Sequence, residues 1–404
     1  MTIRMDEGAA ELLDTLHRAG YAAYVVGGCV RDSLLGLTPH DWDLCTSALP
    51  QQVMELFGAQ RCIPTGLQHG TVTVKQSGAL YEITTFRTEG TYTDGRHPDE
   101  VHFVPDVRED LARRDFTINA MAYNEKEGLI DPFGGQDDLQ SGILRAVGVP
   151  HQRFTEDALR ILRLYRFAAR FGFSIDPPTA QAAQELCAHL DCVSVERIEE
   201  ELAKLLSAPA PAAYLNEKIL SVVLPELSPE ALAAAKPVVD ACPAGAENLP
   251  VRLAALLLSL GEDGTRRTLR RLRCSNACIE ETAVLVREVV SGVPVSLNIY
   301  ARRLLGRYNL CTVQRIAALG TALQPEHAAD FAALSELAEQ LDADGVCCRV
   351  SQLAVNGRDL MAAGVPAGPG IRKVLEALLD GVIREEYPNE RQALLAAVQQ
   401  LAAS

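Results

Sequence analysis

The strongest constraint on this chain is a pair of glycines, Gly27-Gly28, followed by two aspartates spaced one residue apart, Asp41 and Asp43. The segment 24–26 favours a strand, so the glycines are expected to form a tight turn where backbone amides can approach a phosphate. Two carboxylates on an extended segment point the same way because strand side chains alternate. Such a pair is either a solvated loop or a metal site, since Mg²⁺ takes one or two carboxylates together with substrate phosphates. The order of phosphate turn and paired carboxylates favours the metal site and indicates nucleotidyl transfer.

Composition describes a soluble globular chain of several domains. Its 404 residues exceed one ordinary core, and they are 48% hydrophobic and 23% charged. Eleven cysteines are scattered without metal-ligand spacing, which is typical of reduced thiols in a cytoplasmic protein. The apolar run at 254–260 is too short to span a bilayer, and the N-terminus lacks the pattern of a secretory signal. We therefore expect a cytoplasmic protein with no membrane partner.

Secondary-structure signals change along the chain. An amphipathic helix is predicted over 9–19, and short β-branched runs follow. Together with the Asp41 segment, these runs predict one small sheet of about five strands. The runs span residues 23–26, 71–74, 81–85 and 101–104. After about residue 150, a 3.6-residue periodicity predicts helices to the C-terminus. The expected fold class is thus an α+β head followed by all-α segments, mostly helical overall.

A second constellation follows the head, where Asp157, Arg160, Arg163 and Arg166 recur at spacings of three. On one helix this spacing brings neighbouring turns together, and an ordinary intrahelical ion pair would look the same. A carboxylate only accepts hydrogen bonds and a guanidinium only donates them. Cytosine and adenine present an amino donor beside a ring-nitrogen acceptor, whereas guanine and uracil present the reverse. An Asp beside an Arg could therefore select C and A without a nucleic-acid template.

The net charge of −15 argues on its face against a nucleic-acid partner. A local cluster softens this objection, because several arginines fall within one short helical stretch. The cluster comprises Arg266, Arg267, Arg270, Arg271 and Arg273. It is either a phosphate-contacting face or a solvated helix surface.

These motifs, with several others, resemble those of the class II tRNA nucleotidyltransferases, the CCA-adding enzymes, of the bacterial subgroup without a phosphohydrolase domain. The likeness runs almost without a gap from residue 24 to about 172, and a tail-like segment lies at 356–370. The matching blocks are Val26-Gly27-Gly28-Cys29-Val30-Arg31-Asp32 with Asp41-x-Asp43, Glu82-Ile83-Thr84-Thr85-Phe86-Arg87, Arg113-Arg114-Asp115-Phe116-Thr117-Ile118-Asn119-Ala120, Asp131-Pro132-Phe133-Gly134-Gly135 and Glu156-Asp157-Ala158-Leu159-Arg160-Ile161-Leu162-Arg163.

The resemblance implies a polymerase-β-like head and three helical parts. With the breaks in the sequence, it places a nucleotidyltransferase head at 1–140 and a neck with the base-reading helix at 141–207. A body at 208–300 and a tRNA-binding tail at 301–404 follow. The expected partners are tRNA, at its acceptor arm and 3′ end, with CTP and ATP. The oligomeric state is left open between a monomer and a homodimer.

The resemblance also implies roles for residues. Asp41 and Asp43 would hold Mg²⁺, with Glu82 a third catalytic carboxylate. Gly28 and Arg31 would contact the triphosphate, and Arg114 the nucleotide. Four side chains would form the nucleotide-binding helix, with the first two facing the base edge; they are Asp157, Arg160, Arg163 and Arg166. Asp115 and Asn119 would either select ribose or serve structure alone.

The implied reaction is attack by the RNA 3′-hydroxyl on the α-phosphorus of CTP or ATP, adding C, C and A and releasing pyrophosphate. Bacterial poly(A) polymerases share the head motifs but usually carry a long basic extension, which this acidic chain lacks. A CC-only enzyme would lack the head loop at 87–98, which is intact in the sequence. An enzyme that adds only A stays open, as does, more remotely, an inactive RNA-binding module.

Overall fold

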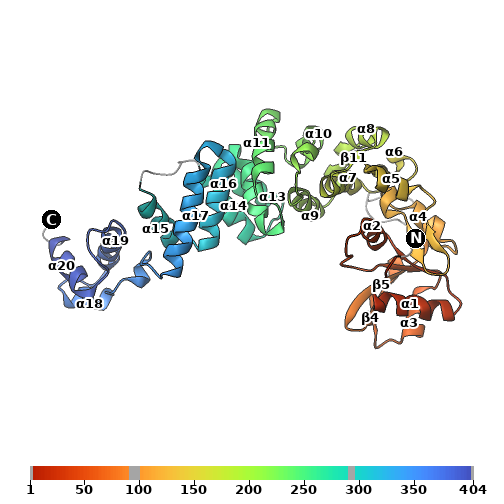
Figure 1. The fold of residues 1–404 in the computed structure, drawn as a ribbon, viewed down its shortest axis with the longest axis horizontal. Helices are drawn as coiled ribbons and strands as arrows, with labels where there is room; N and C mark the ends of the chain where they lie inside the picture. The colour runs from red at the N-terminus through yellow and green to blue at the C-terminus, as the bar shows by residue number, and fades with distance from the viewer. Residues whose placement is uncertain (1–2, 91–100, 290–295, 402–404) are drawn as a thin grey trace. The chain divides into compact units, whose positions relative to one another are not determined.

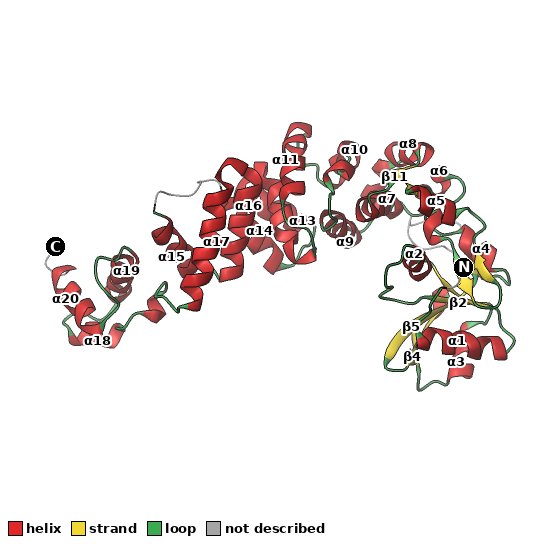
Figure 2. Cartoon of the chain, in the orientation of Figure 1, coloured by secondary structure: helices red, strands yellow, loops and turns green. Residues whose placement is uncertain are grey.

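The computed structural model describes residues 3–90, 101–289 and 296–401. The chain divides into two compact units, Met1–Pro225 and Glu226–Ser404. Strands occur only in the first unit among the described residues, whereas the second contains helices and loops (Figure 2). The expected α+β head followed by helical segments is thereby confirmed. The division between the units falls inside the predicted body at 208–300, and the finer four-part division stays a prediction.

A mixed seven-stranded sheet forms the centre of the head, in the order β3-β4-β5-β2-β1-β8-β9. Its strands are β1 (Ala23–Val26), β2 (Leu44–Thr46), β3 (Cys62–Gly66), β4 (Thr71–Gln76), β5 (Ala79–Thr85), β8 (Ala122–Asn124) and β9 (Gly128–Ile130). Every residue of β1 is buried. The continuous apolar run at 23–26 therefore fits its place inside the sheet, between β2 and β8. Strand β2 pairs antiparallel with β1 and parallel with β5, and these three strands carry the residues of the site.

The prediction of about five strands was too low. Strands β3, β8 and β9 were missed because they are short and carry glycine, proline or asparagine, which weaken a strand pattern. The run at 101–104 forms β7 (Val101–Phe103), which pairs with β6 (Arg87–Glu89) outside the main sheet. The predicted head loop at 87–98 lies only partly within the described residues, since 91–98 are not among them.

Helices cover the sheet of the head. Helix α1 (Glu7–Arg18) packs on β1 and β2, and α3 (Pro50–Phe57) packs on β4 and β5 (Figure 1). The predicted helix over 9–19 is confirmed with slightly earlier ends, because the side chain of Asp6 accepts from the backbone of Ala9 at 3.2 Å and caps it. Tyr24, Val26 and Phe86 join Val107 and Leu111 in a buried apolar cluster.

The remaining elements of the first unit are mostly helical. A second short pairing joins β10 (Ile143–Leu144) and β11 (Ser174–Ile175), the last strand in the described chain. The helices are α2 (Gly28–Leu34), α4 (Val107–Ala112), α5 (Gly135–Ser141), α6 (Pro150–Glu156), α7 (Leu159–Phe171), α8 (Pro177–Glu185), α9 (Val195–Leu206) and α10 (Glu217–Val223). Helix α7 is buried along most of its length and packs closely on α9.

The second unit is an array of packed helices. They are α11 (Pro229–Ala241), α12 (Leu249–Leu257), α13 (Gly261–Arg271), α14 (Asn276–Val289), α15 (Leu297–Arg307), α16 (Leu310–Leu323), α17 (Ala328–Ala343), α18 (Gly357–Ala362), α19 (Pro369–Ile383) and α20 (Arg391–Leu401). The last three surround their own apolar cluster, which includes Leu360, Leu378 and Leu394. None of the helices among the described residues has the length and apolarity needed to cross a membrane.

The packing around Gly135 yields a first prediction. A Cβ atom at Gly135 would lie 2.2 Å from the backbone oxygen of Thr117, which cannot move aside as a flexible side chain could. Gly135→Ala should therefore lower the free energy of unfolding of the first unit by about 1–3 kcal/mol, measured by urea denaturation. Gly370→Ala is the matched control, because a Cβ there meets no atom within 4 Å. Equal stability of the two variants would contradict this packing.

Candidate active site

The glycine turn stands where the sequence predicts it. Strand β1 ends at Val26, Gly27 adopts φ of 78°, and α2 begins at Gly28. An L side chain rarely adopts this backbone conformation, and a Cβ at Gly27 would lie 2.8 Å from Nη1 of Arg114. Glycine at position 27 thus allows the Arg114 guanidinium to lie directly against the backbone of the turn.

The predicted metal carboxylates lie beside this turn. Asp41 and Asp43 precede β2 rather than lying within it, although the backbone oxygen of Asp43 still accepts from the amide of Val26 at 2.9 Å. Because β2 and β5 pair in parallel with Leu44 opposite Ile83, Asp43 falls next to Glu82. Desolvation raises the pKa of Asp43, Arg114 opposes the rise, and the neighbouring Glu82 and Asp41 add to it. The neighbouring carboxylates of Glu82 and Asp41 therefore add to the cost of ionising Asp43.

These residues fit a divalent ion that is shared with phosphate. Throughout 3–90, 101–289 and 296–401, no group of three or more His, Cys, Asp or Glu side chains is arranged to hold a metal ion alone. Over the same residues, Asp41, Asp43 and Glu82 form no recorded ion pair that would neutralise them. Mg²⁺ is commonly bound by one or two carboxylates and completes its shell with substrate phosphates. The oxygen donors and the crowding of charge therefore suit Mg²⁺ held jointly with a triphosphate.

Arg31 is buried behind the turn rather than exposed in it. Only 4% of the residue is accessible, and its guanidinium donates to Asp32 at 2.7 Å and to Asn119 at 2.5 Å. It also lies over the rings of Phe167 and Phe171 on α7, 5.2 and 4.9 Å from their centroids. Direct contact of Arg31 with a triphosphate stays a prediction. Its contacts with Asp32 on α2 and with the two phenylalanines on α7 link the turn to α7.

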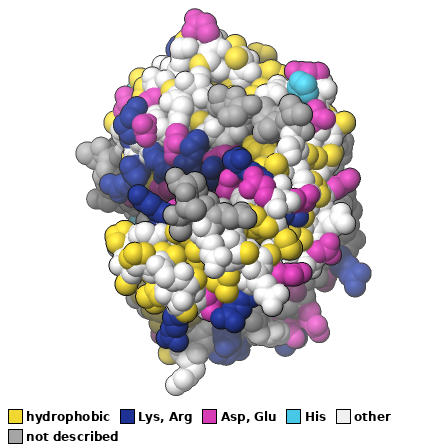
Figure 3. Space-filling view, turned by 90° about the vertical axis from the view of Figure 1, so that its left-hand side faces the viewer, with side chains coloured by type: hydrophobic (Ala, Val, Ile, Leu, Met, Phe, Trp, Pro, Cys, Tyr) yellow, Lys and Arg dark blue, Asp and Glu magenta, His cyan; other side chains and the backbone are white. Residues whose placement is uncertain are grey.

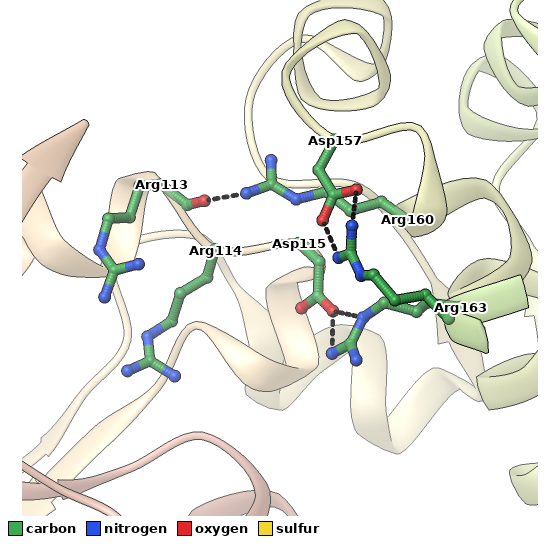
Figure 4. Close-up of a pocket in the computed structure, with 7 residues that line it drawn as sticks. Arg113, Arg114, Asp115, Asp157, Arg160 and Arg163 are labelled. Carbon is green, nitrogen blue, oxygen red and sulfur yellow. Dashed lines mark hydrogen bonds and ion pairs between the residues drawn. The ribbon is translucent and has the colours of Figure 1, made fainter. Parts of the chain in front are cut away.

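A cavity of about 270 Å³ lies where the head meets α7 and α9 (Figure 4). It is lined by Arg113, Arg114, Asp115, Asp157, Arg160, Arg163 and Arg197. The lining thus combines five guanidinium groups with two carboxylates, which suits an anionic ligand that also presents a polar edge. Four of the predicted nucleotide-binding residues meet in this cavity.

Other predicted residues lie outside the lining of this cavity. Arg166 instead stacks over Phe167, with 3.8 Å from its guanidinium carbon to the ring centroid, and its Nε lies 2.5 Å from Oε2 of Glu201. Gly28 and Arg31 belong to the turn, and the metal carboxylates lie beside it. Arg114 joins the two places, because it lines the cavity, lies against Gly27 and opposes the rise in the pKa of Asp43.

The expectation that Asp157 shares one helix with the arginines is wrong. Asp157 has an extended backbone, φ −143°, in the break between α6 and α7. From there its Oδ1 accepts from the amide of Leu159, the first residue of α7, at 3.0 Å. Arg160 lies on α7 and donates to the backbone oxygens of Arg113, at 3.0 Å, and Arg153, at 3.2 Å. Asp157 and Arg160 nevertheless meet in the cavity, as the base-reading hypothesis requires (Figure 4).

Sequence reasoning missed Arg113 and Arg197 as candidate residues. Arg113 could have been found, because it stands beside Arg114 in a block that the sequence already singles out. Arg197 lies on α9, forty positions beyond Asp157, and nothing local in the sequence ties it to the cavity. The open question about Asp115 is partly answered, since its carboxylate lines the cavity and also binds Arg163 through Oδ2, with 2.7 and 2.9 Å contacts.

Four arginines of the predicted RNA-binding cluster lie on α13 and divide into two kinds of side chain, whereas Arg273 follows the end of the helix. Arg266 pairs with Glu262 at 3.0 Å and with Glu280, and Arg271 pairs with Glu226 at 2.7 Å. Arg267 and Arg270 are exposed, and no ion pair is recorded for either within the described part of the chain. Only these two keep the character of a free phosphate-contacting face.

Family models match most of the chain in three consecutive parts. Residues 23–145 match a Poly A polymerase head domain, and 172–230 match a probable RNA- and SrmB-binding site of polymerase A. Residues 250–398 match the putative second domain of tRNA nucleotidyltransferases. The CCA-adding enzyme of Lactiplantibacillus plantarum is 38% identical over 397 residues, covering 96% of this chain and 95% of that protein. The chain belongs to the family of CCA-adding enzymes.

Solved structures of this family share its fold. The CCA-adding enzyme of Bacillus stearothermophilus in complex with CTP is 32% identical, with a TM-score of 0.84 covering 99% of this chain and 98% of that chain. The Thermotoga maritima CCA-adding enzyme complexed with tRNA is 22% identical with a TM-score of 0.71, and this likeness concerns the fold alone. Nucleotidyltransferases of this family use a divalent metal, which agrees with the carboxylates beside the glycine turn.

The repulsion around Asp43 yields a second prediction. A carboxyl whose pKa is raised by folding destabilises the folded state once it ionises, so stability falls as the pH rises through that pKa. At neutral pH without metal, Asp43→Asn should raise the thermal midpoint by about 1–2 °C. It should also remove the stabilisation that Mg²⁺ together with CTP gives the unaltered protein. Differential scanning fluorimetry in EDTA, and in Mg²⁺ with CTP, measures both effects.

Glu125→Gln serves as the control for this experiment, since Glu125 is an exposed carboxylate in the turn between β8 and β9 of the same unit. It should respond to Mg²⁺ with CTP as the unaltered protein does. A lower midpoint for Asp43→Asn, or a response to Mg²⁺ with CTP that survives the substitution, would show that Asp43 is not a metal-binding carboxylate.

Proposed function

We propose that this chain adds C, C and A to the 3′ end of tRNA from CTP and ATP, without a nucleic-acid template, and releases pyrophosphate. One observation carries the proposal: Arg114 lies at once in the cavity of Asp157 and Arg160 and against the glycine turn beside the carboxylates. A nucleotide has a base edge at one end and a triphosphate at the other, and this arrangement offers a place for each. The family membership of the whole chain supports the same function.

The base is chosen by hydrogen-bond polarity at one end of the site. Asp157 supplies an acceptor for the amino group of cytosine or adenine, and Arg160 supplies donors for the adjacent ring nitrogen. With uracil or guanine, the Asp157 acceptor would face a carbonyl and the Arg160 donors would face a ring N–H. Neither pair can form a hydrogen bond, so buried groups would stay unpaired. Each such mismatch costs about 1–3 kcal/mol. The cavity can therefore favour the two amino-bearing bases over the other two.

The triphosphate is held at the other end of the site. Gly27 and Gly28 leave the backbone of the turn open, and Arg114 adds positive charge beside it. Asp41 and Asp43 would hold Mg²⁺, which when bound neutralises phosphate charge and activates the attacking 3′-hydroxyl. The chain itself positions the reacting groups, since phosphoryl transfer of this kind needs alignment and charge neutralisation rather than a protein nucleophile. No cysteine is required for these steps.

Three other functions are separated from this one by a simple assay. The family model that matches the head is that of poly(A) polymerases. The match over 250–398 to a tRNA nucleotidyltransferase domain nevertheless favours tRNA as the substrate. The test incubates tRNA lacking its last three nucleotides, and separately tRNA that ends in CC, with CTP, ATP or both. We expect two added residues with CTP alone and three with both. Growth by one A, on the CC-ending tRNA only, would favour the A-adding enzyme. A long A-tail would favour the poly(A) polymerase, and no growth on either tRNA would favour the inactive module.

The base-reading pair yields a third prediction. Arg160→Ala should lower kcat/KM for CTP and ATP by about 10- to 100-fold and affect UTP and GTP much less, because the lost donors matched only the amino-bearing bases. Single-nucleotide incorporation with each triphosphate measures the effect. Lys204→Ala, an exposed residue of α9 paired with Glu200, is the control. An equal loss for all four triphosphates would contradict edge recognition.

A groove in the second unit offers a further surface for RNA. It is a cavity of about 880 Å³ between α15, α19 and the segment 348–351, and its lining includes Arg303, Arg307, Arg349 and Arg372 beside Glu376 and Asp380. Figure 3, which views the molecule from the side where its C-terminus lies, shows basic side chains gathered near a hydrophobic area. Excess guanidinium groups in a wide groove suit a phosphate backbone. This supports the prediction that the tail at 301–404 binds tRNA.

Salt dependence of tRNA binding provides a fourth prediction. Replacing Arg267 and Arg270 together by Ala should weaken binding and reduce the slope of log K against log salt by about 1–2, if both contact phosphates. Filter binding between 50 and 200 mM salt measures the slope. Arg18→Ala, an exposed arginine of α1 paired with Asp14, is the control. An unaltered slope would show that the α13 cluster is a solvated helix surface that does not contact tRNA phosphates.

The cytoplasmic location stays a prediction, and the choice between a monomer and a homodimer stays open. The assays above apply equally to a monomer and to a dimer.

A further inference from the structure

The groove between α15 and α19 contains carboxylates as well as arginines. Its four arginines are accompanied by two acidic residues of α19, Glu376 and Asp380. Figure 3 shows acidic and basic side chains close together on this side of the molecule. Whether an RNA phosphate can bind a given arginine of the groove therefore depends on whether a carboxylate already holds that arginine.

Asp380 holds Arg303 across the groove. Its Oδ1 lies 2.7 Å from Nη2 of Arg303, which belongs to α15. Its Oδ2 lies 2.8 Å from Nε of Arg384, four residues later in the chain. The side chains of Arg303 and Asp380 are 43% and 42% accessible, so an RNA backbone can reach both. The charge of Arg303 is thus neutralised in the protein without RNA, although the side chain is within reach of a phosphate.

Arg349 is fixed in the same groove without a carboxylate. Its Nε donates to the backbone oxygen of Leu305 at 3.0 Å, and its Nη2 donates to that of Tyr308 at 3.1 Å. No ion pair of Arg349 is recorded within residues 3–90, 101–289 and 296–401. A guanidinium group has five N–H donors, so several remain for a phosphate. Arg349 therefore offers RNA a positive charge that Arg303 does not.

The contact between α15 and α19 does not depend on Asp380 alone. Arg302 donates from Nη1 to the backbone oxygen of Val382 at 3.2 Å, and it pairs with Glu385 at 3.3 Å. Only 13% of the Arg302 side chain is accessible. The pair of Arg303 and Asp380 is more exposed, and exposed ion pairs add little to stability. The effect of Asp380 on the charge of the groove is therefore separable from the packing of the two helices.

We propose that Asp380 is a specificity-determining residue, which holds Arg303 and so limits the binding of RNA other than tRNA in the groove. The inference rests on the proposed function, with the groove as its RNA surface. A flexible single strand can place a phosphate against any available cation, whereas a folded RNA presents its phosphates at fixed positions. A carboxylate among the arginines therefore disfavours the flexible strand more than a backbone that fits. Specificity of this kind combines attractive groups with a repulsive one.

The test compares tRNA lacking its last three nucleotides with an unstructured oligouridine of similar length. Filter binding at several salt concentrations gives the Kd of each RNA. Asp380→Asn should tighten oligouridine binding by about 3- to 10-fold and increase its slope of log K against log salt by about 0.7, the contribution of one phosphate contact. The Kd for tRNA should change much less, so the selectivity for tRNA falls.

Asp14→Asn is the matched control for the change in charge. It alters the net charge of the chain equally and removes the carboxylate that pairs with Arg18 on α1, outside the groove. The ratio of the two Kd values should stay as in the unaltered protein. Asp380→Glu keeps the negative charge in the groove, and it should also keep a ratio close to that of the unaltered protein.

A double-variant cycle assigns the effect to Arg303. The gain in oligouridine binding that Asp380→Asn gives should disappear when Arg303→Ala is added, since the released cation is then missing. A gain that survives in the double variant would assign it to Arg384 and overturn the role of Arg303. Thermal unfolding followed by circular dichroism confirms that each variant is folded.

Four further results would overturn the proposal. Unchanged oligouridine binding in Asp380→Asn would show that the ion pair does not limit binding. Equal tightening of both RNAs would show a general effect of charge, and equal weakening would show that Asp380 serves the structure of the groove. Unaltered tRNA binding in Arg349→Ala would show that the groove is not an RNA surface. If the unaltered protein binds both RNAs but transfers no nucleotide, the proposed function fails, while the two Kd values still decide the role of Asp380.

Discussion

The site depends on one buried carboxylate, that of Asp115. Its Oδ1 accepts from the amide of Phe116 at 2.8 Å and from Asn119 at 3.1 Å, while its Oδ2 receives two donors of Arg163. Burial alone would raise the pKa of Asp115, but Arg163 and Asn119 outweigh it and hold the pKa well below the usual range. The carboxylate is thus ionised near neutral pH, and its stabilisation is lost only as the pH falls below the ordinary aspartate value of about 3.9.

From Asp115 a chain of contacts runs back to the phosphate turn. Asn119 accepts from Arg31 through its Oδ1 and donates to Asp115 through its Nδ2. Arg31 belongs to α2, which begins at Gly28, and Arg163 belongs to α7, which also carries Arg160 of the proposed base-reading pair. The two ends of the proposed nucleotide site are therefore tied through two side chains of one segment, 115–119. Polar networks of this kind fix one geometry when every member is satisfied.

The sequence predicted the parts of this site better than their assembly. The glycine turn and the central strands were predictable because their residues act locally, through backbone freedom and short apolar, β-branched runs. Asp157 was misplaced because a spacing of three fits a continuous helix, whereas α6 ends at Glu156 and Asp157 has an extended backbone before α7 begins. Arg197 was missed because its partner is distant in sequence, and such pairs leave no periodic signal in one chain.

The edge strand β3 shows that sequence patterns also miss elements of the fold that depend on a distant partner. Strand β3 contains Pro64 and ends at Gly66, and its place at the edge comes from pairing with β4 rather than from its own propensity. Local pattern therefore identified strands that carry a distinct apolar, β-branched run, while β3, β8 and β9, which are short and interrupted by proline, glycine or asparagine, were missed.

A crystal structure of this chain with CTP and Mn²⁺ tests the central claim most directly. Manganese scatters anomalously and substitutes for magnesium at oxygen ligands. The account predicts an anomalous peak at the oxygens of Asp41 and Asp43, with the cytosine amino group about 3 Å from Oδ2 of Asp157. A metal peak away from both aspartates, or a cytosine edge that contacts neither Asp157 nor Arg160, would contradict it.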